Sequence, residues 1–351
     1  MGQVTTKSLS EYLRKDKSED KICKSLKKYN IKSENKSDYP IIFKAVDKNK
    51  IKVVQKLLDM GYDINKQIGK DLPSRCEEKY KDETLLMRAI NENKTEIATL
   101  LINDKKCNLE IKNRSGRTAF YYALAENNFI LINLMLSREV NLNVQTKSGI
   151  SYLILLVSKI ENGRIMSLVD NTERDMSRID KSYQTMKKEY DDLFKKLVSV
   201  SNLNAVDSYR MSVLSYLFSL TKRYFLNTTW KLQPVEYPPQ DVLDTLYNKE
   251  YINTIINHHL DKNDITFLDH YYDDIGDRFF GRDGRWGTYD HSRRNEKLIA
   301  YLYNNNLMGK VKNVYKTKIF QCIDNDAFLS SQFKNEYYDP NIIGLIVDFV
   351  Y

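Results

Sequence analysis

The feature that most constrains this chain is a repeat in the first half of its sequence. Three segments align on Ala45, Ala89 and Ala123, and each carries an asparagine four residues after the alanine. Each segment continues into an aliphatic stretch and closes on a tripeptide similar to Asp/Asn–Ile/Leu–Asn. A unit of this size cannot bury its apolar face alone, so we expect neighbouring units to stack against one another.

The residue types in the repeat indicate helices joined by short loops. The small alanines allow the first helix of each unit to pack closely on its partner, and Gly61 stands where a helix must end with a positive φ. Glycine (12) and proline (6) are too scarce for a turn-rich β-sandwich or barrel. Three apolar pairs are expected to fill the gaps between units: Leu57–Leu58, Leu100–Leu101 and Met135–Leu136.

In this pattern the sequence resembles the ankyrin-repeat family, whose unit has about 33 residues and opens on Thr-Pro-Leu-His-x-Ala. The resemblance implies an all-α solenoid of about six or seven helix-turn-helix units with insertions. It divides the chain into a basic segment with a degenerate capping repeat, regular repeats, divergent repeats with insertions, and a C-terminal capping helix. These four parts are residues 1–36, 37–157, 158–335 and 336–351.

Beyond residue 157 the register of the repeat is harder to follow. After the slot at Leu156, the polar stretch 159–190 is interpreted as an extended or inserted helix, and the second helix is expected near Leu193–Val198. Further units are expected around slots at Leu217 and Tyr271. Residues 19–32 are expected to form the second helix of the capping repeat.

The family resemblance also implies a non-enzymatic scaffold that binds another protein. Partners of such stacks usually touch the hairpin fingertips and the exposed side of the first helices. The positions that correspond to these surfaces are Lys44, Arg88 and Tyr122, just before the alanines, and Arg114 and Arg117 in a fingertip. Asn113, Ser115, Lys147 and Ser148 are fingertip positions as well, and the hairpin at 67–82 is lengthened into a protruding finger.

A second candidate contact surface is the segment 277–294, where arginines alternate with aromatic residues. Arg282, Arg285 and Trp286 are of the types enriched at binding hot spots. Aspartates in and beside the segment dilute its charge, so a structural loop held by its own salt bridges is an alternative.

No pattern in the sequence selects a catalytic, cofactor or metal site. The four cysteines lie far apart, the four histidines have no metal-ligand spacing, and no phosphate-binding loop or nucleophile motif is visible. We therefore expect no cofactor and no metal, with an enzyme site in the divergent half as the alternative. Without a secretory leader or a long apolar run, the expected location is the cytoplasm.

The start of the chain offers a possible membrane signal. Gly2 and Thr6 fit the pattern for N-myristoylation, and residues 1–36 carry a net charge of +5. A single acyl chain anchors only marginally, and this basic segment could supply the second signal on anionic lipid; a solvated helix face is the alternative. The other 315 residues carry only +3, so a nucleic-acid partner is not expected.

The apolar C-terminal segment 339–351 weakly resembles the start of the F-box-like motif that closes many poxviral ankyrin proteins. That resemblance implies a second function, a substrate adaptor for a ubiquitin ligase. A plain capping helix is the simpler interpretation.

Overall fold

The computed structural model describes residues 5–31, 39–68, 82–169, 177–218, 248–268 and 296–325. Within these ranges every regular element is a helix, and the β-pairing consists of two isolated bridges, Gln67 with Thr84 and Gln145 with Ser151. The predicted all-α class is confirmed. The chain divides into two compact units, residues 1–155 and 156–351, which are described separately below.

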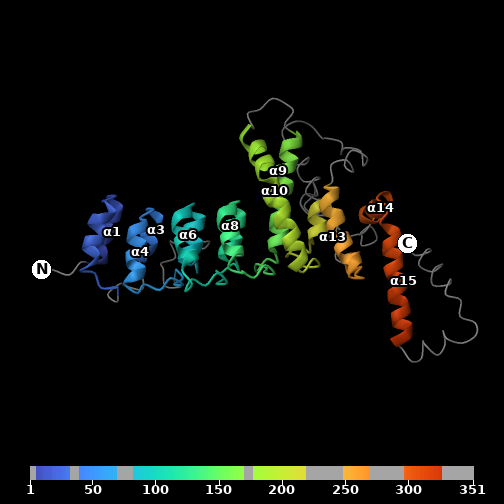
Figure 1. Cartoon of the computed structure of the whole chain (residues 1–351), viewed down its shortest axis with the longest axis horizontal. Coiled ribbons are helices and arrows are strands. Elements are labelled where there is room, and N and C mark those ends of the chain that lie inside the picture. The colour runs from blue at the N-terminus through green and yellow to red at the C-terminus, as the bar shows by residue number, and fades with distance from the viewer. Residues whose placement is uncertain are drawn as a thin grey trace, which may run out of the picture. The chain divides into compact units, whose positions relative to one another are not determined.

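The N-terminal unit contains four helix pairs (Figure 1). First helices pack on the first helices of neighbouring pairs, and second helices pack on second helices. The pairs are α1 (Thr6–Arg14) with α2 (Glu19–Leu26), α3 (Ile41–Asp47) with α4 (Ile51–Asp59), α5 (Leu85–Asn91) with α6 (Thr95–Asn103), and α7 (Ala119–Ala125) with α8 (Phe129–Leu136).

The turn within each pair explains the asparagine of the repeat. Asn49, Asn93 and Asn127 have φ values of 51°, 55° and 54°, in the left-handed region that asparagine tolerates better than most residues. In each turn the next amide donates to the carbonyl of the slot alanine, at 2.8 to 2.9 Å. Asp16 makes the same turn between α1 and α2, with φ 50°.

The core of this unit lies between the helix pairs. Ala45, Ala89 and Ala123 are completely buried, as their small size requires. Each predicted apolar pair places one member in the core and leaves the other half-buried. The buried members are Leu57, Leu101 and Met135.

The closing tripeptide forms a side-chain-to-backbone turn that recurs in both units. In each copy the oxygen of the first side chain accepts from the amide two residues later, at 2.9 to 3.1 Å. The five copies are Asp63–Asn65, Asn108–Glu110, Asn141–Asn143, Asn202–Asn204 and Asp264–Thr266.

The third side chain of this turn joins one repeat to the next. Asn65 Oδ1 accepts from the Asn108 amide at 2.8 Å, and Asn65 Nδ2 donates to the Lys106 carbonyl at 2.9 Å. Glu110 Oε1 accepts from the Asn141 amide at 2.9 Å. The sequence therefore encodes the contact between neighbouring repeats as well as the repeat itself.

The C-terminal unit has longer and less regular helices. α9 (Tyr152–Val169) crosses the division between the units, and α10 (Ser177–Val200) begins well before Leu193, where the second helix of this repeat was expected. A short helix at 213–218 follows. The remaining described elements are α13 (Lys249–Asp261), the 3₁₀ helix η3 (Thr266–Leu268), α14 (Glu296–Asn304) and α15 (Met308–Asn325).

One helix pair was not foreseen from the sequence. Asn306, with φ 57°, joins α14 to α15, and the Leu307 amide donates to the Leu302 carbonyl at 2.8 Å. This is the same turn as in the N-terminal repeats, with Leu302 in the slot that alanine occupies there. The slot proposed at Tyr271 lies outside the described residues.

Candidate functional site

The repeat places three of the predicted contact residues on successive first helices. Lys44 lies on α3, Arg88 on α5 and Tyr122 on α7, each just before a buried alanine. Because α3 packs on α5 and α5 on α7, the three side chains belong to one face of the N-terminal unit. We call this surface the first-helix face.

Arg88 is held by two carboxylates of this face. Its Nε donates to Asp47 Oδ1 at 2.8 Å, and its second ion pair is with Glu92 at 3.1 Å. Burial by itself would lower the pKa of Arg88, but the hydrogen bond to Asp47 and the electrostatic attraction of Tyr39, Asp47 and Glu92 together outweigh burial and raise that pKa. The Arg88 side chain is only 14% exposed, so its predicted exposure is wrong: the guanidinium joins α3 to α5.

Tyr122 is the second residue whose predicted exposure is wrong. Its hydroxyl donates to Glu83 Oε1 at 2.8 Å and accepts from Asn113 Nδ2 at 2.9 Å, and the residue is only 6% exposed. The ring is buried because its hydroxyl joins a fingertip to the preceding repeat. Burial raises the pKa of Tyr122.

Glu83 is a buried carboxyl that sequence reasoning missed. It is 1% exposed, burial raises its pKa, and Oε2 has no hydrogen-bond partner among the described residues. Tyr39 and Asp47 were missed as well; the Tyr39 hydroxyl donates to Asp47 Oδ2 at 3.0 Å. The sequence offered one signal for Glu83, its position in the repeat. Glu83 directly precedes Thr84, the N-cap of α5, just as Arg117 directly precedes Thr118, the N-cap of α7.

The predicted fingertip residues differ in exposure: Asn113 is buried and Arg117 is half-buried, whereas Arg114, Ser115, Lys147 and Ser148 are exposed. The Arg114 side chain is 43% exposed, and its Nε lies 3.6 Å from Asp82 Oδ2. The Arg117 guanidinium lies 4.9 Å from the centroid of the Tyr121 ring, in the geometry of a cation–π contact. The Lys147 amide donates to the Ser115 carbonyl at 3.0 Å, so successive fingertips are bonded through their backbones.

Lys44 shows the third environment on this face. It is half-buried, and its Nζ donates to Ser10 Oγ of α1 at 2.9 Å. Lys44 is therefore joined to its neighbour by one hydrogen bond to a neutral hydroxyl, whereas Arg88 and Tyr122 contact carboxylates. Replacing Arg88 and Tyr122 would disturb the packing of the repeats, which makes them poor reporters of binding.

The C-terminal unit repeats the hydrogen bond between a fingertip side chain and the slot tyrosine. Tyr216 donates from its hydroxyl to Asp207 Oδ2 at 2.7 Å, over the same nine-residue separation that joins Tyr122 to Asn113. Asp207 Oδ1 accepts from the amide of Met211, as Asn113 Oδ1 accepts from that of Arg117. The finger of a divergent repeat therefore keeps the arrangement of a regular one.

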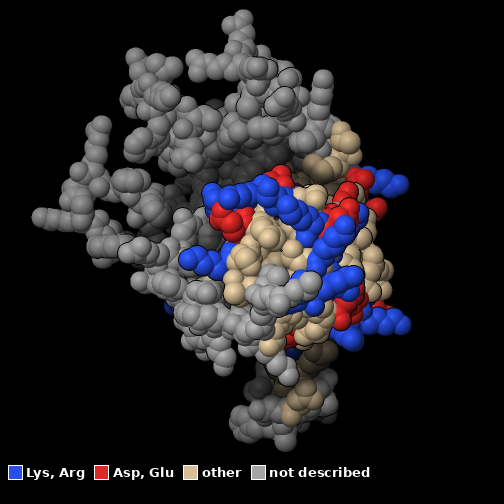
Figure 2. Space-filling view, turned by 90° about the vertical axis from the view of Figure 1, so that its left-hand side faces the viewer, with Lys and Arg blue, Asp and Glu red and all other residues tan. Residues whose placement is uncertain are grey.

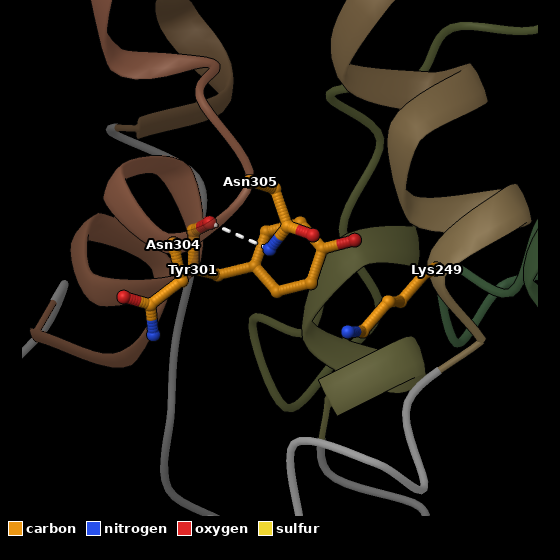
Figure 3. Close-up of a pocket in the computed structure, with 4 residues that line it drawn as sticks. All are labelled: Lys249, Tyr301, Asn304 and Asn305. Carbon is orange, nitrogen blue, oxygen red and sulfur yellow. Dashed lines mark hydrogen bonds between the residues drawn. The ribbon is translucent and has the colours of Figure 1, made fainter.

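A small polar hollow lies between α13 and α14 (Figure 3). Lys249 extends from the start of α13 toward the Tyr301 ring, and Asn304 and Asn305 line it from the end of α14. Asn305 Nδ2 donates to the Tyr301 carbonyl at 2.8 Å. Its volume of about 140 Å³ is smaller than the roughly 300–1,000 Å³ of sites for drug-sized ligands, so it fits a single side chain or a few waters.

Several predicted features lie outside the described residues. These are Gly2, Arg282, Arg285, Trp286, most of the finger at 67–82, and the segment 339–351. In the ranges that are described, no cluster of three metal-ligating side chains occurs, and Cys23, Cys107 and Cys322 are free thiols. None of the described helices is both long and apolar enough to span a membrane.

Two histidines, His258 and His259, lie in the last turn of α13. His259 is buried, and its Nδ1 lies 2.8 Å from Asp264 Oδ2. The Asp264 carboxylate also accepts from the amide and the hydroxyl of Thr266. The imidazole therefore supports the closing turn of its repeat.

Paired helices stacked through fingertips and closing turns define a helical-repeat protein, and comparison with known proteins specifies the kind. Residues 66–146 match the family model for ankyrin repeats (3 copies). Alpha-latrotoxin-Lg1a from Latrodectus geometricus is 26% identical over 160 residues, which is 45% of this chain and 11% of that protein. Putative ankyrin repeat protein FPV034 from fowlpox virus (strain NVSL) is 26% identical over 137 residues, 39% of this chain and 29% of that protein.

The chain thus matches less than a third of the length of either relative. Among solved structures, the ankyrin-repeat protein EF0377 aligns over 64% of this chain and 95% of its own, with 18% identity and a TM-score of 0.44. An ankyrin repeat domain from Acinetobacter baumannii AYE aligns over 62% and 92%, with 16% identity and a TM-score of 0.43. The chain therefore contains ankyrin repeats, which the family model matches at residues 66–146, as the sequence pattern predicted.

Proposed function

We propose that the N-terminal unit is a non-enzymatic scaffold that binds a protein partner through its fingertips and the first-helix face. Ankyrin repeats generally mediate protein–protein interaction, and stacked repeats offer an extended surface for it. The observation that carries the proposal is that the residues of this surface have two different roles. Arg88 and Tyr122 fix the repeats relative to one another, while basic residues of the fingertips remain exposed.

The chemistry of the fingertips favours an acidic partner. Lys112, Arg114 and Lys147, which we call the basic fingertips, are all exposed. Lys112 and Lys147 form no ion pair with any described residue. By contrast, the nearby carboxylate of Glu110 already accepts from the amide of the next repeat. Complementary charge across an interface accelerates association and discriminates between partners.

Photo-crosslinking in cells that produce the protein tests the proposal and captures the partner in the same experiment. A photoreactive phenylalanine analogue is placed at Lys147 in a fingertip and, in a second variant, at Lys44 on α3. The matched control places it at Gln55, an exposed residue on the second helix α4. We expect crosslinked species from the first two positions and not from Gln55. Crosslinks confined to Gln55, or equal at all three positions, would contradict the proposed surface.

A further inference from the structure

The capping pair α1/α2 has one apolar side and one charged side. Leu9 and Leu13 of α1 and Ile22 and Leu26 of α2 are buried, and these helices pack on α3 and α4. The outer side is strongly charged: residues 5–31 hold eight basic and four acidic side chains. Figure 2 shows this end of the N-terminal unit, with Lys and Arg spread over its described surface and Asp and Glu among them.

The acidic residues of the pair already have basic or amide partners. Glu11 forms ion pairs with Arg14 and Lys15 on its own helix. Asp16 pairs with Lys50 at 2.6 Å. Glu19 and Asp20, at the start of α2, both contact Lys52. Glu19 accepts a hydrogen bond from the Lys52 amide, and Asp20 lies 3.7 Å from the Lys52 ammonium.

The opposite end of the pair carries lysines. Lys7 lies in the first turn of α1, and Lys24, Lys27 and Lys28 lie at the end of α2; all four are exposed. A hydrogen bond of 3.2 Å between Thr6 Oγ1 and the Tyr29 hydroxyl fixes the start of α1 beside the end of α2. The two groups of lysines therefore share one edge, which we call the basic edge.

The acylation motif immediately precedes α1 in the sequence. Gly2 is four residues before Thr6, the first residue of that helix. Its amino group, freed by removal of Met1, could attack the thioester carbonyl of myristoyl-coenzyme A. An amide bond then forms, the carbon–sulfur bond breaks, and the coenzyme A thiol leaves with the amine proton.

We propose that the basic edge, with a myristoyl chain on Gly2, docks this protein on a membrane surface rich in anionic lipid. One acyl chain gives only marginal, reversible binding, and lysines near an anionic surface supply the second attraction. The structure adds to the sequence motif a group of exposed lysines beside the first turn of α1, the helix that follows the motif in the sequence. This function is independent of partner binding at the fingertips.

The test uses the full-length chain co-expressed with an N-myristoyltransferase, with acylation read by intact mass. Sedimentation compares vesicles of phosphatidylcholine with vesicles that also contain about 30% phosphatidylserine. We expect the acylated protein to prefer the anionic vesicles at least about tenfold, and this preference to fade as salt rises to about 0.5 M. The Gly2→Ala variant is expected to bind anionic vesicles weakly, and only at high lipid concentration.

Two lysine variants separate the basic edge from general charge. Replacing Lys24, Lys27 and Lys28 with Gln removes three attractions and is expected to weaken binding to anionic vesicles between about tenfold and a hundredfold. The matched control replaces three exposed lysines of α10, Lys188, Lys195 and Lys196, and is expected to bind like the wild type. Circular dichroism checks that both variants keep their helices.

Three results would overturn the proposal. The first is an absence of acylation at Gly2, and the second is equal binding of the two lysine variants. The third is a basic edge that binds RNA and ignores the vesicles. None of these results bears on the fingertip surface, because Lys24, Lys27 and Lys28 lie on the capping pair, away from the basic fingertips.

Discussion

Arg138 offers the sharpest test of how neighbouring repeats are joined. It follows α8, and its guanidinium donates to carbonyls at the end of α6 and in the turn that follows α6 in the preceding repeat. The carbonyls of Ile102 and Cys107 accept at 2.6 and 3.0 Å, and that of Asp104 accepts at 3.2 Å. The last four carbonyls of a helix have no partner within the helix, so Arg138 serves as a cap supplied by the next repeat.

The structure sets the expected cost of Arg138→Met. Ile102 and Cys107 are buried, so water is a poor substitute at their carbonyls, whereas Asp104 is more accessible. Hydrogen bonds to charged groups contribute about 1.5–3 kcal/mol each, and two bonds that water cannot replace suggest a loss of about 3 kcal/mol. For a unit of this size the melting temperature should fall by about 6–12 °C.

Urea unfolding followed by far-ultraviolet circular dichroism measures this loss. The matched control is Arg14→Met, whose exposed side chain pairs with Glu11 on its own helix and should leave the urea midpoint nearly unchanged. Arg138→Lys should lie between, since an ammonium cannot reach three carbonyls in one plane. If Arg138→Met were as stable as the control, the guanidinium would not be joining the repeats.

Two further predictions concern the fingertips and the buried carboxyl. Gly116→Ala should destabilise the protein by roughly 3 kcal/mol, and Gly61→Ala by about 1 kcal/mol. Both glycines have a positive φ, but only at Gly116 would the added Cβ meet backbone, the Lys147 nitrogen at 2.8 Å. Equal urea midpoints for the two variants would contradict this. Burial raises the pKa of Glu83 above 4.5, so the stability that this group contributes is complete below that pH and is lost as pH rises through the folded-state value. Glu83→Gln should therefore gain stability relative to the wild type between about pH 4 and pH 8 in urea titrations, unlike the exposed Glu126→Gln; a constant difference would refute the assignment.

The parts of the fold that followed from sequence are those fixed by local constraints. A small slot residue, a left-handed asparagine and a closing tripeptide each impose a requirement within a few residues, and Ala89, Asn93 and Asn108 show all three in one repeat. The pair α14/α15 lacks the alanine, so the sequence signal was weak although the turn at Asn306 is unchanged.

The environment of the candidate site depended on contacts between repeats and could not be predicted from single positions. Tyr122 occupies a slot of the repeat that was expected to be exposed, but it is buried, and Glu83, 39 residues earlier, accepts a hydrogen bond from its hydroxyl. Arg88 is likewise covered because Asp47 lies on the neighbouring first helix. The pattern of one repeat specifies where a side chain starts, and the composition of the next repeat determines what it contacts.

The most direct measurement of the central claim is the affinity of a partner, identified by crosslinking, for a charge-reversed fingertip. Arg114→Glu with Lys147→Glu should weaken binding at least about tenfold, with a smaller effect at high salt, because both residues are exposed and their charges would then repel an acidic partner. The control reverses Lys195 and Lys196 on α10, which are equally exposed. Binding that falls only for the fingertip variant is the predicted result; an unchanged affinity, or an equal loss in both variants, would contradict it.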